Sequence, residues 1–255
     1  MKPIINWKLF FILLAASVAG ALLVMPYQLA MLPEPVALTP VLVLAGLMQN
    51  LVLFGIAIFF GLLLSRRVGM GLPILEGALE CKPQRGALLS LLPLSVGVGA
   101  AGGVITVLLD LPFRKLPITT LLSADTPVWW KGLLASFYGG IAEELMFRLF
   151  LVSFFVWITA KIKKTAAGTP TDFGVWLSIV LSAVLFGLGH LPATAAVTAI
   201  TPLVVVRAVL LNGVIGVAFG VLYWKKSLES AMIAHFSADI VLHVIAAAAS
   251  PLFNP

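Results

Sequence analysis

Three ionisable residues, Glu143, Glu144 and Arg148, interrupt a long apolar run that extends from residue 133 to residue 160. A run of this length is long enough to cross a bilayer, and a charge at its centre costs roughly 2.5–3.5 kcal/mol on insertion scales. Charges at this depth need partners, and they commonly mark a functional site. These residues are therefore the first candidates for chemistry in the chain.

Helical geometry separates the roles of the two glutamates. Glu144 and Arg148 are four residues apart with the acid first, which is the favourable order for an ion pair on a helix. Neighbouring helical residues point about 100° apart, so Glu143 faces away from that pair. We expect Glu144 and Arg148 to neutralise each other and to leave Glu143 free for chemistry. A purely structural charge cluster is the alternative for this segment taken alone.

Two further apolar segments carry polar residues with helical spacing. Phe186 and His190 are four residues apart, so one helix face presents both. His235, Asp239 and His243 form a similar stripe on a later segment. A buried aspartate in lipid surroundings needs a partner, and His235 is the nearest candidate. The alternatives are a packed histidine at a helix end for His190 and an interfacial position for His243.

These polar groups should meet in space. Polar groups buried in a bundle satisfy one another, so the three helices that carry them should converge on one wet cavity. A glutamate and histidines in such a cavity are suited to activating a water molecule, and a histidine N–H stabilises an oxyanion on an attacked carbonyl. In another apolar segment, Asn212 would bond across helices and Arg207 would extend towards the membrane surface.

The composition indicates a membrane protein. Of the 255 residues, 61% are hydrophobic and only 10% are charged, whereas soluble domains carry about 25% charged residues. The formal charge of +6 does not indicate a nucleic-acid partner, because the basic residues cluster between apolar runs as membrane topology requires. Cys81 is the single cysteine, which excludes an internal disulfide and a multi-cysteine metal site.

We predict an all-α, polytopic transmembrane bundle of about seven helices, each near the ~20 residues that a bilayer requires. The predicted spans are 9–29, 40–64, 87–109, 133–160, 173–191, 202–224 and 228–249. With the N-terminus inside, only Arg114, Lys115 and Lys131 are basic residues of the outside connections. This asymmetry predicts an inside N-terminus and an outside C-terminus, in a bacterial-type cytoplasmic membrane or the endoplasmic reticulum alike.

Residues 97–102, Gly-Val-Gly-Ala-Ala-Gly, match a dinucleotide-binding glycine pattern. The pattern lies in the middle of a predicted span with no strand before it, which argues against a nucleotide site. Small residues permit close helix packing within membranes. We therefore expect these glycines to mark a contact between helices.

The predicted depths of the candidate residues disagree. At ~1.5 Å per residue, Glu143 and His190 fall about 20 Å from the inner ends of their helices, but His235 falls only about 10 Å in. A recessed connection before the last helix, a strong tilt or different span ends would reconcile these depths. His243 has the matching depth, which keeps it among the candidates.

The ordered set of motifs resembles a known family. The motifs are Glu143-Glu144-x-x-x-Arg148, Phe186-x-x-x-His190 and His235-x-x-x-Asp239. In this order they resemble the CPBP intramembrane proteases, which include type II CAAX prenyl proteases and the Abi, or CAAX-protease self-immunity, proteins. The resemblance covers about 133–249. It implies N-terminal helices over 1–130 and a CPBP-like catalytic core over 131–250.

The resemblance also implies an activity and roles. The chain would be an intramembrane endopeptidase, a hydrolase, acting on a membrane-associated peptide or protein such as a prenylated CAAX-type substrate, with the lipid bilayer as its other partner. Glu143 would be the general base on the hydrolytic water, and His190 would bind and polarise that water. Glu144 and Arg148 would support the site, and His235 would stabilise the oxyanion together with residue 239.

The last motif position departs from the family pattern, which often has asparagine where this chain has Asp239. An ionised aspartate donates no hydrogen bond. Asp239 would therefore have to be protonated, orient His235 or act in another way.

A metal is the alternative to direct activation of water. If zinc or another divalent ion bound, its ligands would be Glu143, His190, His235 and Asp239. The chain has no His-Glu-x-x-His motif, and we favour a metal-independent site without a cofactor.

Two other functions remain open from the sequence. Intramembrane Glu, His and Asp residues also serve as proton relays, so a proton- or ion-coupled transporter is one alternative. Against it, the chain has no inverted repeat and no paired broken helices. A non-catalytic membrane scaffold or immunity protein is the other alternative.

Overall fold

The computed structural model describes residues 5–32, 39–114, 116 and 127–253. Within these ranges the regular structure is helical, and the one strand-like pairing is an isolated bridge between Lys164 and Pro170. The predicted all-α class is therefore confirmed. Lys115, expected in an outside connection, lies outside the described residues.

Within the described residues, seven helical stretches are long and apolar enough to cross a membrane. They are α1 (Trp7–Met31), α2 (Pro40–Val68), α4 (Arg85–Arg114), Trp129–Ile162, Asp172–Ala195, α9 (Pro202–Lys225) and Leu228–Ala249. They match the predicted spans to within a few residues, and the largest difference is that α4 continues to Arg114. Large apolar side chains such as Val41 and Phe173 are exposed, as suits contact with lipid tails. The chain is a multi-pass membrane protein, and its orientation stays a prediction.

Polar side chains determine where most of these helices begin. A cap residue precedes the first turn and accepts a hydrogen bond from the backbone N–H three residues later. These caps are Asn6, Thr39, Thr171, Thr201 and Ser227. Pro40 and Pro202 follow two of them at the first helical position, where a missing N–H has no cost. The caps thus satisfy backbone donors that the helix itself leaves free.

Three of the spans are composite. The span Trp129–Ile162 consists of α5 (Trp129–Phe137), the π-helical segments η2 (Tyr138–Glu143) and η3 (Leu145–Val152), and α6 (Ser153–Ile162). The last helical stretch consists of α10 (Leu228–Asp239), the π-helical η4 (Ile240–Ile245) and α11 (Ala246–Phe253). The span before α9 consists of α7 (Asp172–Gly189) and α8 (Leu191–Ala195), which meet at His190. Since π-helical turns are rare and frequently lie at functional sites, the positions of Glu143 and Asp239 at such turns support their candidacy.

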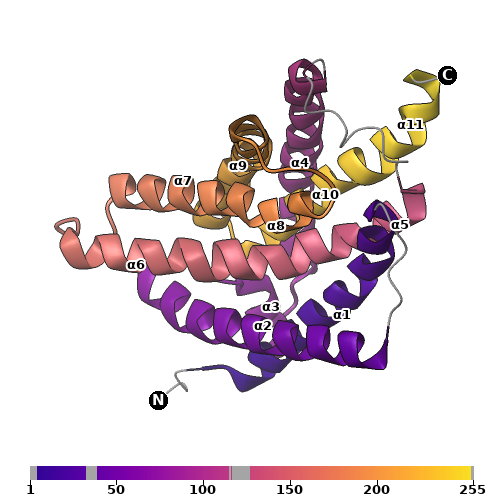
Figure 1. Ribbon diagram of the computed structural model, residues 1–255. Coiled ribbons are helices and arrows are strands. Elements are labelled where there is room, and N and C mark those ends of the chain that lie inside the picture. Colours follow the sequence, from indigo (N-terminus) through magenta and orange to yellow (C-terminus); the bar gives the residue numbers. More distant parts are fainter. Residues whose placement is uncertain (1–4, 33–38, 115, 117–126, 254–255) are drawn as a thin grey trace.

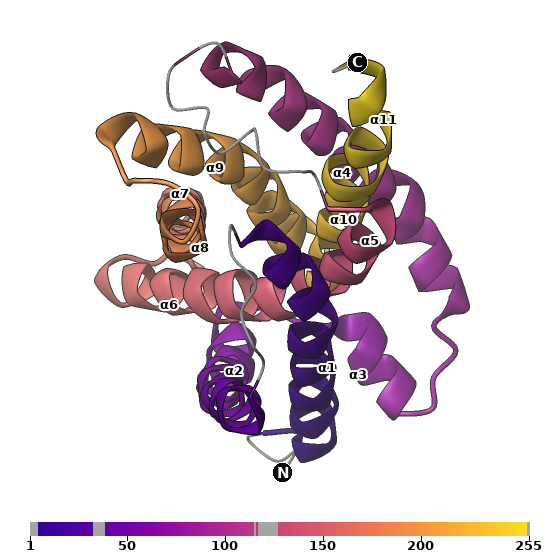
Figure 2. The same ribbon diagram turned by 45° about the vertical axis from the view of Figure 1, so that its right-hand side comes forward.

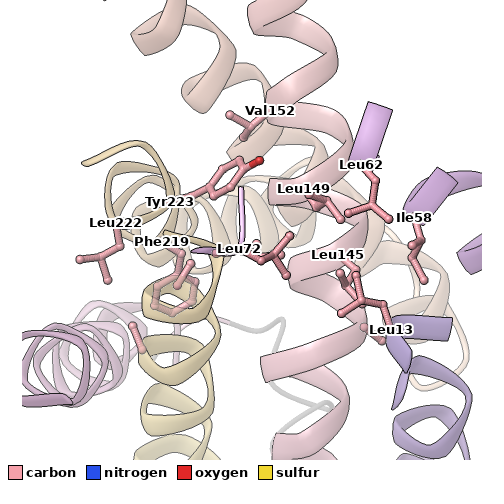
Figure 3. Close-up of a cluster of buried hydrophobic side chains, with 14 of the residues drawn as sticks. Leu13, Ile58, Leu62, Leu72, Leu145, Leu149, Val152, Phe219, Leu222 and Tyr223 are labelled. Carbon is pink, nitrogen blue, oxygen red and sulfur yellow. The ribbon is translucent and has the colours of Figure 1, made fainter. Parts of the chain in front are cut away.

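The composite helix Trp129–Ile162 lies at the centre of the bundle, between α2 on one side and α7 on the other (Figures 1 and 2). Its middle carries the buried core, in which η3 meets α1, α2 and α9 (Figure 3). The side chains involved include Leu145, Leu149, Val152, Leu13, Ile58, Leu62, Phe219 and Tyr223. The segment with the charged residues is therefore held on several sides by packed helices.

Two glycines of the pattern in α4, Gly99 and Gly102, lie at helix contacts as predicted, and so does Gly103 directly after it, whereas a Cβ on Gly97 would meet open space. A Cβ on Gly99 would overlap the backbone carbonyl of Ala234 in α10, and a Cβ on Gly103 would lie 2.8 Å from the Cβ of Val241. Only glycine permits this approach without moving a backbone. The contact fixes the helix that carries His235 against α4.

The turn between α9 and α10 is covered by protein. Ser227 and Leu228 are buried, and the backbone N–H of Leu228 donates to the Gly71 carbonyl at 3.0 Å. The short helix α3 (Pro73–Leu79) lies here, and its Leu75 N–H donates to the Glu229 carboxylate at 2.9 Å. This buried turn agrees with a recessed connection before the last helix, the first of the three explanations for the mismatch in depth.

Candidate active site

Glu144 and Arg148 form the expected ion pair, with Arg148 Nη1 at 2.9 Å from Glu144 Oε1. Both side chains are buried. Arg148 Nη2 donates to the Gly216 carbonyl of α9 at 3.1 Å, and the guanidinium lies 4.7 Å and 5.2 Å from the ring centres of Phe186 and Phe219. A buried arginine needs such contacts, because water does not reach it. The pair therefore ties the central helix to α7 and α9.

His235 reaches the same carboxylate from α10. Its Nδ1–H donates to Glu144 Oε1 at 2.7 Å, and its ring stacks on Phe219 at 4.7 Å with an angle of 25° between the planes. The opposite nitrogen, Nε2, lies 3.6 Å from Glu143 Oε2 and 3.7 Å from Asp239 Oδ1. Since Nδ1 is committed to Glu144, Nε2 is the nitrogen that remains for chemistry.

The two glutamates differ in access. The Glu144 side chain is 0% exposed, whereas the Glu143 side chain is 17% exposed. Glu144 is already paired with both Arg148 and His235. Glu143 is thus the glutamate that a molecule from outside is able to approach, as expected from helical geometry.

His190 lies where α7 ends, and an aromatic ring lies between it and His235. Its Nδ1–H donates to the Phe186 carbonyl at 2.8 Å, which leaves Nε2 as an acceptor when the ring is neutral. The Phe186 ring packs perpendicular to His190 at 4.8 Å and to His235 at 5.6 Å. Within the described part of the chain, His190 makes no hydrogen bond or ion pair with Glu143 or His235. The Phe186 ring therefore separates the imidazoles of His190 and His235.

The stripe on the last helix continues towards the surface. Asp239 Oδ1 lies 3.7 Å from His235 Nε2 and 3.9 Å from His243 Nε2, so these contacts are electrostatic and too long for hydrogen bonds. His243 Nδ1 forms a 3.0 Å hydrogen bond with the hydroxyl of Tyr27 in α1. We name Glu143, Glu144, Arg148, His235 and Asp239 the central cluster. His243 and Tyr27 connect it to α1, which sequence reasoning had treated only as an additional span.

Glycine at position 139 makes room for the central cluster. A Cβ there would overlap the carboxylate of Asp239 and lie 3.0 Å from His235 Nε2. Neither Tyr27 nor Gly139 was a candidate from sequence. The one signal for Gly139 is its place four residues before Glu143, on the same helix face.

A cavity of about 700 Å³ lies beside the central cluster, at the end of the bundle where α1 ends and α9 begins. His190, His243, Asn212 and Tyr27 line it together with mostly apolar side chains. Glu143 and His235 do not line it. The structure thus brings the central cluster together and places His190 and His243 between that cluster and the cavity.

The sequence expectations for two residues of α9 need correction. Asn212 Nδ2 donates to the Ala208 carbonyl of its own helix at 2.9 Å, not to another helix. Arg207 does not extend freely to the surface, because its Nε donates to Asp110 Oδ1 of α4 at 2.7 Å. Helix packing places acceptors close to both donors, and local bonds then satisfy them.

The proposed metal ligands do not form a binding group. Among the described residues, no three His, Cys, Asp or Glu side chains are arranged so that they would hold a metal ion. The Phe186 ring lies between His190 and His235, so His190 does not join the other side chains around one point that an ion would occupy. These residues therefore do not fit the divalent ion of the metal alternative, and no step below involves one.

Residues 125–241 match the family model described as type II CAAX prenyl endopeptidase Rce1-like. No curated protein and no solved structure matches the chain. The matched range contains every member of the central cluster together with Phe186 and His190, whereas Tyr27 and His243 lie outside it. The chain is therefore a multi-pass membrane protein whose residues 125–241 form a domain of the Rce1-like type II CAAX prenyl endopeptidase family.

Proposed function

We propose that this protein is an intramembrane endopeptidase that hydrolyses a peptide bond of a membrane-associated substrate by activating a water molecule. The observation that carries the proposal is the pair formed by Glu143 Oε2 and His235 Nε2, 3.6 Å apart, beside a second glutamate whose Oε1 is paired with both Arg148 and His235. A prenylated CAAX-type protein is the substrate class that the family suggests.

Glu143 acts as the general base in this proposal. It is the more accessible glutamate, and Arg148 does not neutralise it directly. It takes a proton from water while the oxygen of that water attacks the substrate carbonyl carbon. His190, with its Nδ1–H bound to the Phe186 carbonyl, directs Nε2 to the same water and orients it. The proton on Glu143 then passes to the leaving amine as the peptide bond breaks.

His235 stabilises the oxyanion. Its Nδ1–H is bound to Glu144, so a second proton on Nε2 is required for donation to the carbonyl oxygen. Asp239, 3.7 Å from that nitrogen, is a positioning residue that favours the ring orientation. In this assignment Asp239 acts on the His235 ring through its charge and has no need to donate a hydrogen bond.

The test is cleavage of lipidated and transmembrane peptides by the purified protein in detergent. Glu143→Gln keeps the size of the side chain and removes the base, so we expect a loss of about 10²–10⁴ in kcat. His190→Gln should lower kcat as well. Glu80→Gln is the matched control, because Glu80 is exposed and pairs with Lys82 far from the cluster.

Unchanged cleavage by Glu143→Gln would overturn the assignment of the base. Ion flux in proteoliposomes without peptidase activity would instead favour the transporter, and a cellular phenotype that survives Glu143→Gln would favour a scaffold. Repeating the wild-type assay with a chelator tests the metal alternative, and we expect the rate to stay unchanged because the described donors do not fit an ion.

A further inference from the structure

A second cavity, of about 290 Å³, lies where the ends of α2 and α6 meet the turn that leads to α7 (Figure 1). Three basic side chains line it, and among the described residues no acidic side chain does. They are Arg67 at the end of α2, Lys161 at the end of α6 and Lys164 in the turn. We name this cavity the basic pocket. Lys161 lies eighteen residues beyond Glu143, on the order of 25 Å along the helix, so the pocket is separate from the central cluster.

The protein does not neutralise the three cations of the basic pocket. Among the described residues, none of them forms an ion pair, whereas the neighbouring Arg66 binds Glu76 of α3 at 3.3 Å. The carboxyl ends of α2 and α6 contribute only about half a negative charge each. The pocket therefore keeps an excess of positive charge, which suits an anion with several acceptor oxygens, such as a phosphate group.

The turn after α6 gives the basic pocket a fixed wall. Lys164 and Pro170 form the isolated bridge across it, and the Thr165 N–H donates to the Thr169 carbonyl at 3.0 Å. Gly168 has a φ of 79°, a left-handed conformation that glycine adopts without strain, and its N–H donates to the Thr165 carbonyl at 2.9 Å. These bonds hold the backbone that carries Lys164, so little ordering is left for a ligand to impose.

The surroundings of the basic pocket indicate a lipid as the source of the phosphate. Ile162, directly after Lys161, is 81% exposed, and Phe173 at the start of α7 is 77% exposed, as suits contact with acyl chains. Trp157 lines the pocket with its ring centre 5.6 Å from Lys161 Nζ, and tryptophan is enriched at membrane interfaces. The volume is near the lower limit for ligand pockets, so it suits a headgroup and leaves acyl chains outside. The predicted orientation places this end of the bundle inside, where anionic lipids attract basic residues.

We propose that the basic pocket binds the phosphate of an anionic phospholipid headgroup, with Arg67, Lys161 and Lys164 as the donors. Because these side chains come from α2, α6 and the turn before α7, the bound headgroup holds three neighbouring segments together at one end of the bundle. The inference does not depend on the proposed endopeptidase function, and it concerns neither the central cluster nor the larger cavity.

The experiment measures binding of short-chain lipids to the purified full chain in detergent, where no membrane surface potential attracts every basic residue alike. Phosphatidylglycerol is the anionic probe, phosphatidylcholine is the zwitterionic one, and inorganic phosphate is the probe without acyl chains. Microscale thermophoresis gives the three Kd values. We expect the wild type to bind phosphatidylglycerol at least about tenfold more tightly than either of the others, the effect of one hydrogen bond to a charged group.

Two double variants remove the same charge from neighbouring positions. Arg67→Gln with Lys164→Gln takes two donors from the basic pocket, so the Kd for phosphatidylglycerol should rise about tenfold to a hundredfold. Arg66→Gln with Lys163→Gln is the matched control, because neither side chain lines the pocket, and it should change that Kd less than about threefold. All four side chains are exposed, so both variants should fold. The wild-type comparison of the two lipids decides the matter if a variant fails to fold.

Three results would overturn the inference. Equal losses of affinity in the two double variants would mean that net charge alone attracts the lipid. Equal Kd values for the two lipids would mean that the headgroup charge is not recognised. Tighter binding of inorganic phosphate than of phosphatidylglycerol would indicate a site for a free phosphate instead of a lipid. Since each readout is binding and not cleavage, failure of the endopeptidase proposal leaves this inference standing, and its own failure leaves the endopeptidase untouched.

Discussion

Two groups of charges lie within the bundle, and they differ in burial and in the sign of the excess charge. The central cluster holds three carboxylates and one arginine: all three carboxylates contact His235, and Glu144 also pairs with Arg148. The second group, which we name the rim triad, consists of Asp110, Arg114 and Arg207 and places two arginines on one carboxylate. Arg148 is buried between aromatic rings, whereas the side chains of Arg207 and Arg114 are 24% and 49% exposed.

The difference in burial has a physical consequence. A buried negative excess suits a base, since few counter-charges compete for the carboxylates. Charges that are open to water are screened by ions and contribute little to stability. The same residue types are thus strongly coupled in one place and weakly coupled in the other.

The largest expected difference between the two groups is in stability. Arg148→Met leaves the buried Glu144 without its cation, so we expect it to lower the free energy of unfolding by about 3–5 kcal/mol. Arg114→Met removes a half-exposed partner and should cost about 1 kcal/mol or less. Denaturant unfolding in detergent measures both. Adding Glu144→Gln to Arg148→Met should recover part of the loss, and equal losses for the two single variants would contradict the comparison.

The second expected difference is in rate. His235→Gln removes the proposed oxyanion donor, so kcat should fall by about 10²–10³ with little change in KM. His243, one turn beyond Asp239 and half-buried at the cavity, should affect kcat less than about tenfold when changed to Gln. Steady-state kinetics with one peptide check both variants. A larger loss of kcat for His243→Gln would move the reactive centre towards the cavity.

The sequence predicted the features that depend on a single helix. The spans followed from length and hydrophobicity, and the Glu144–Arg148 pair and the His235–Asp239 stripe followed from spacing along a helix. The sequence also predicted that the polar residues of distant helices meet, as Glu143 and His235 do, but it did not predict contacts of residues outside the motifs. Tyr27 meets His243 across 216 positions, and Arg207 meets Asp110 across 97.

The sequence also did not predict the local helix geometry. The predictions assume regular helices of 3.6 residues per turn, and no simple sequence pattern indicates the π-helical segments η2 and η4. The buried turn before α10 depends on α3 and the Glu229 carboxylate, which lie far apart in the chain. Depth calculated from residue counts was therefore inconsistent, although Glu143 and His235 do meet.

A smaller effect is expected at Asp239, the member of the central cluster next to His243. Asp239→Asn keeps a polar side chain of the same size beside His235 and adds a donor, so kcat should stay within about tenfold of the wild type. Asp239→Leu removes the polar group and should lower kcat further. The ratio of the two rates is the measurement. Equal losses would mean that the charge at position 239, and not its orientation of His235, matters for the reaction.

The smallest expected effect is that of salt. Arg207 and Arg114 are partly exposed, so added ions should screen their attraction to Asp110, while the central cluster is buried and screened far less. Between low and high salt we expect the stability cost of Arg114→Met to fall towards zero and that of Arg148→Met to stay constant. Denaturant unfolding of both variants at the two salt concentrations is the measurement. A fall with salt in the cost of Arg148→Met would show that ions reach the central cluster, and the contrast in burial would no longer separate the two groups.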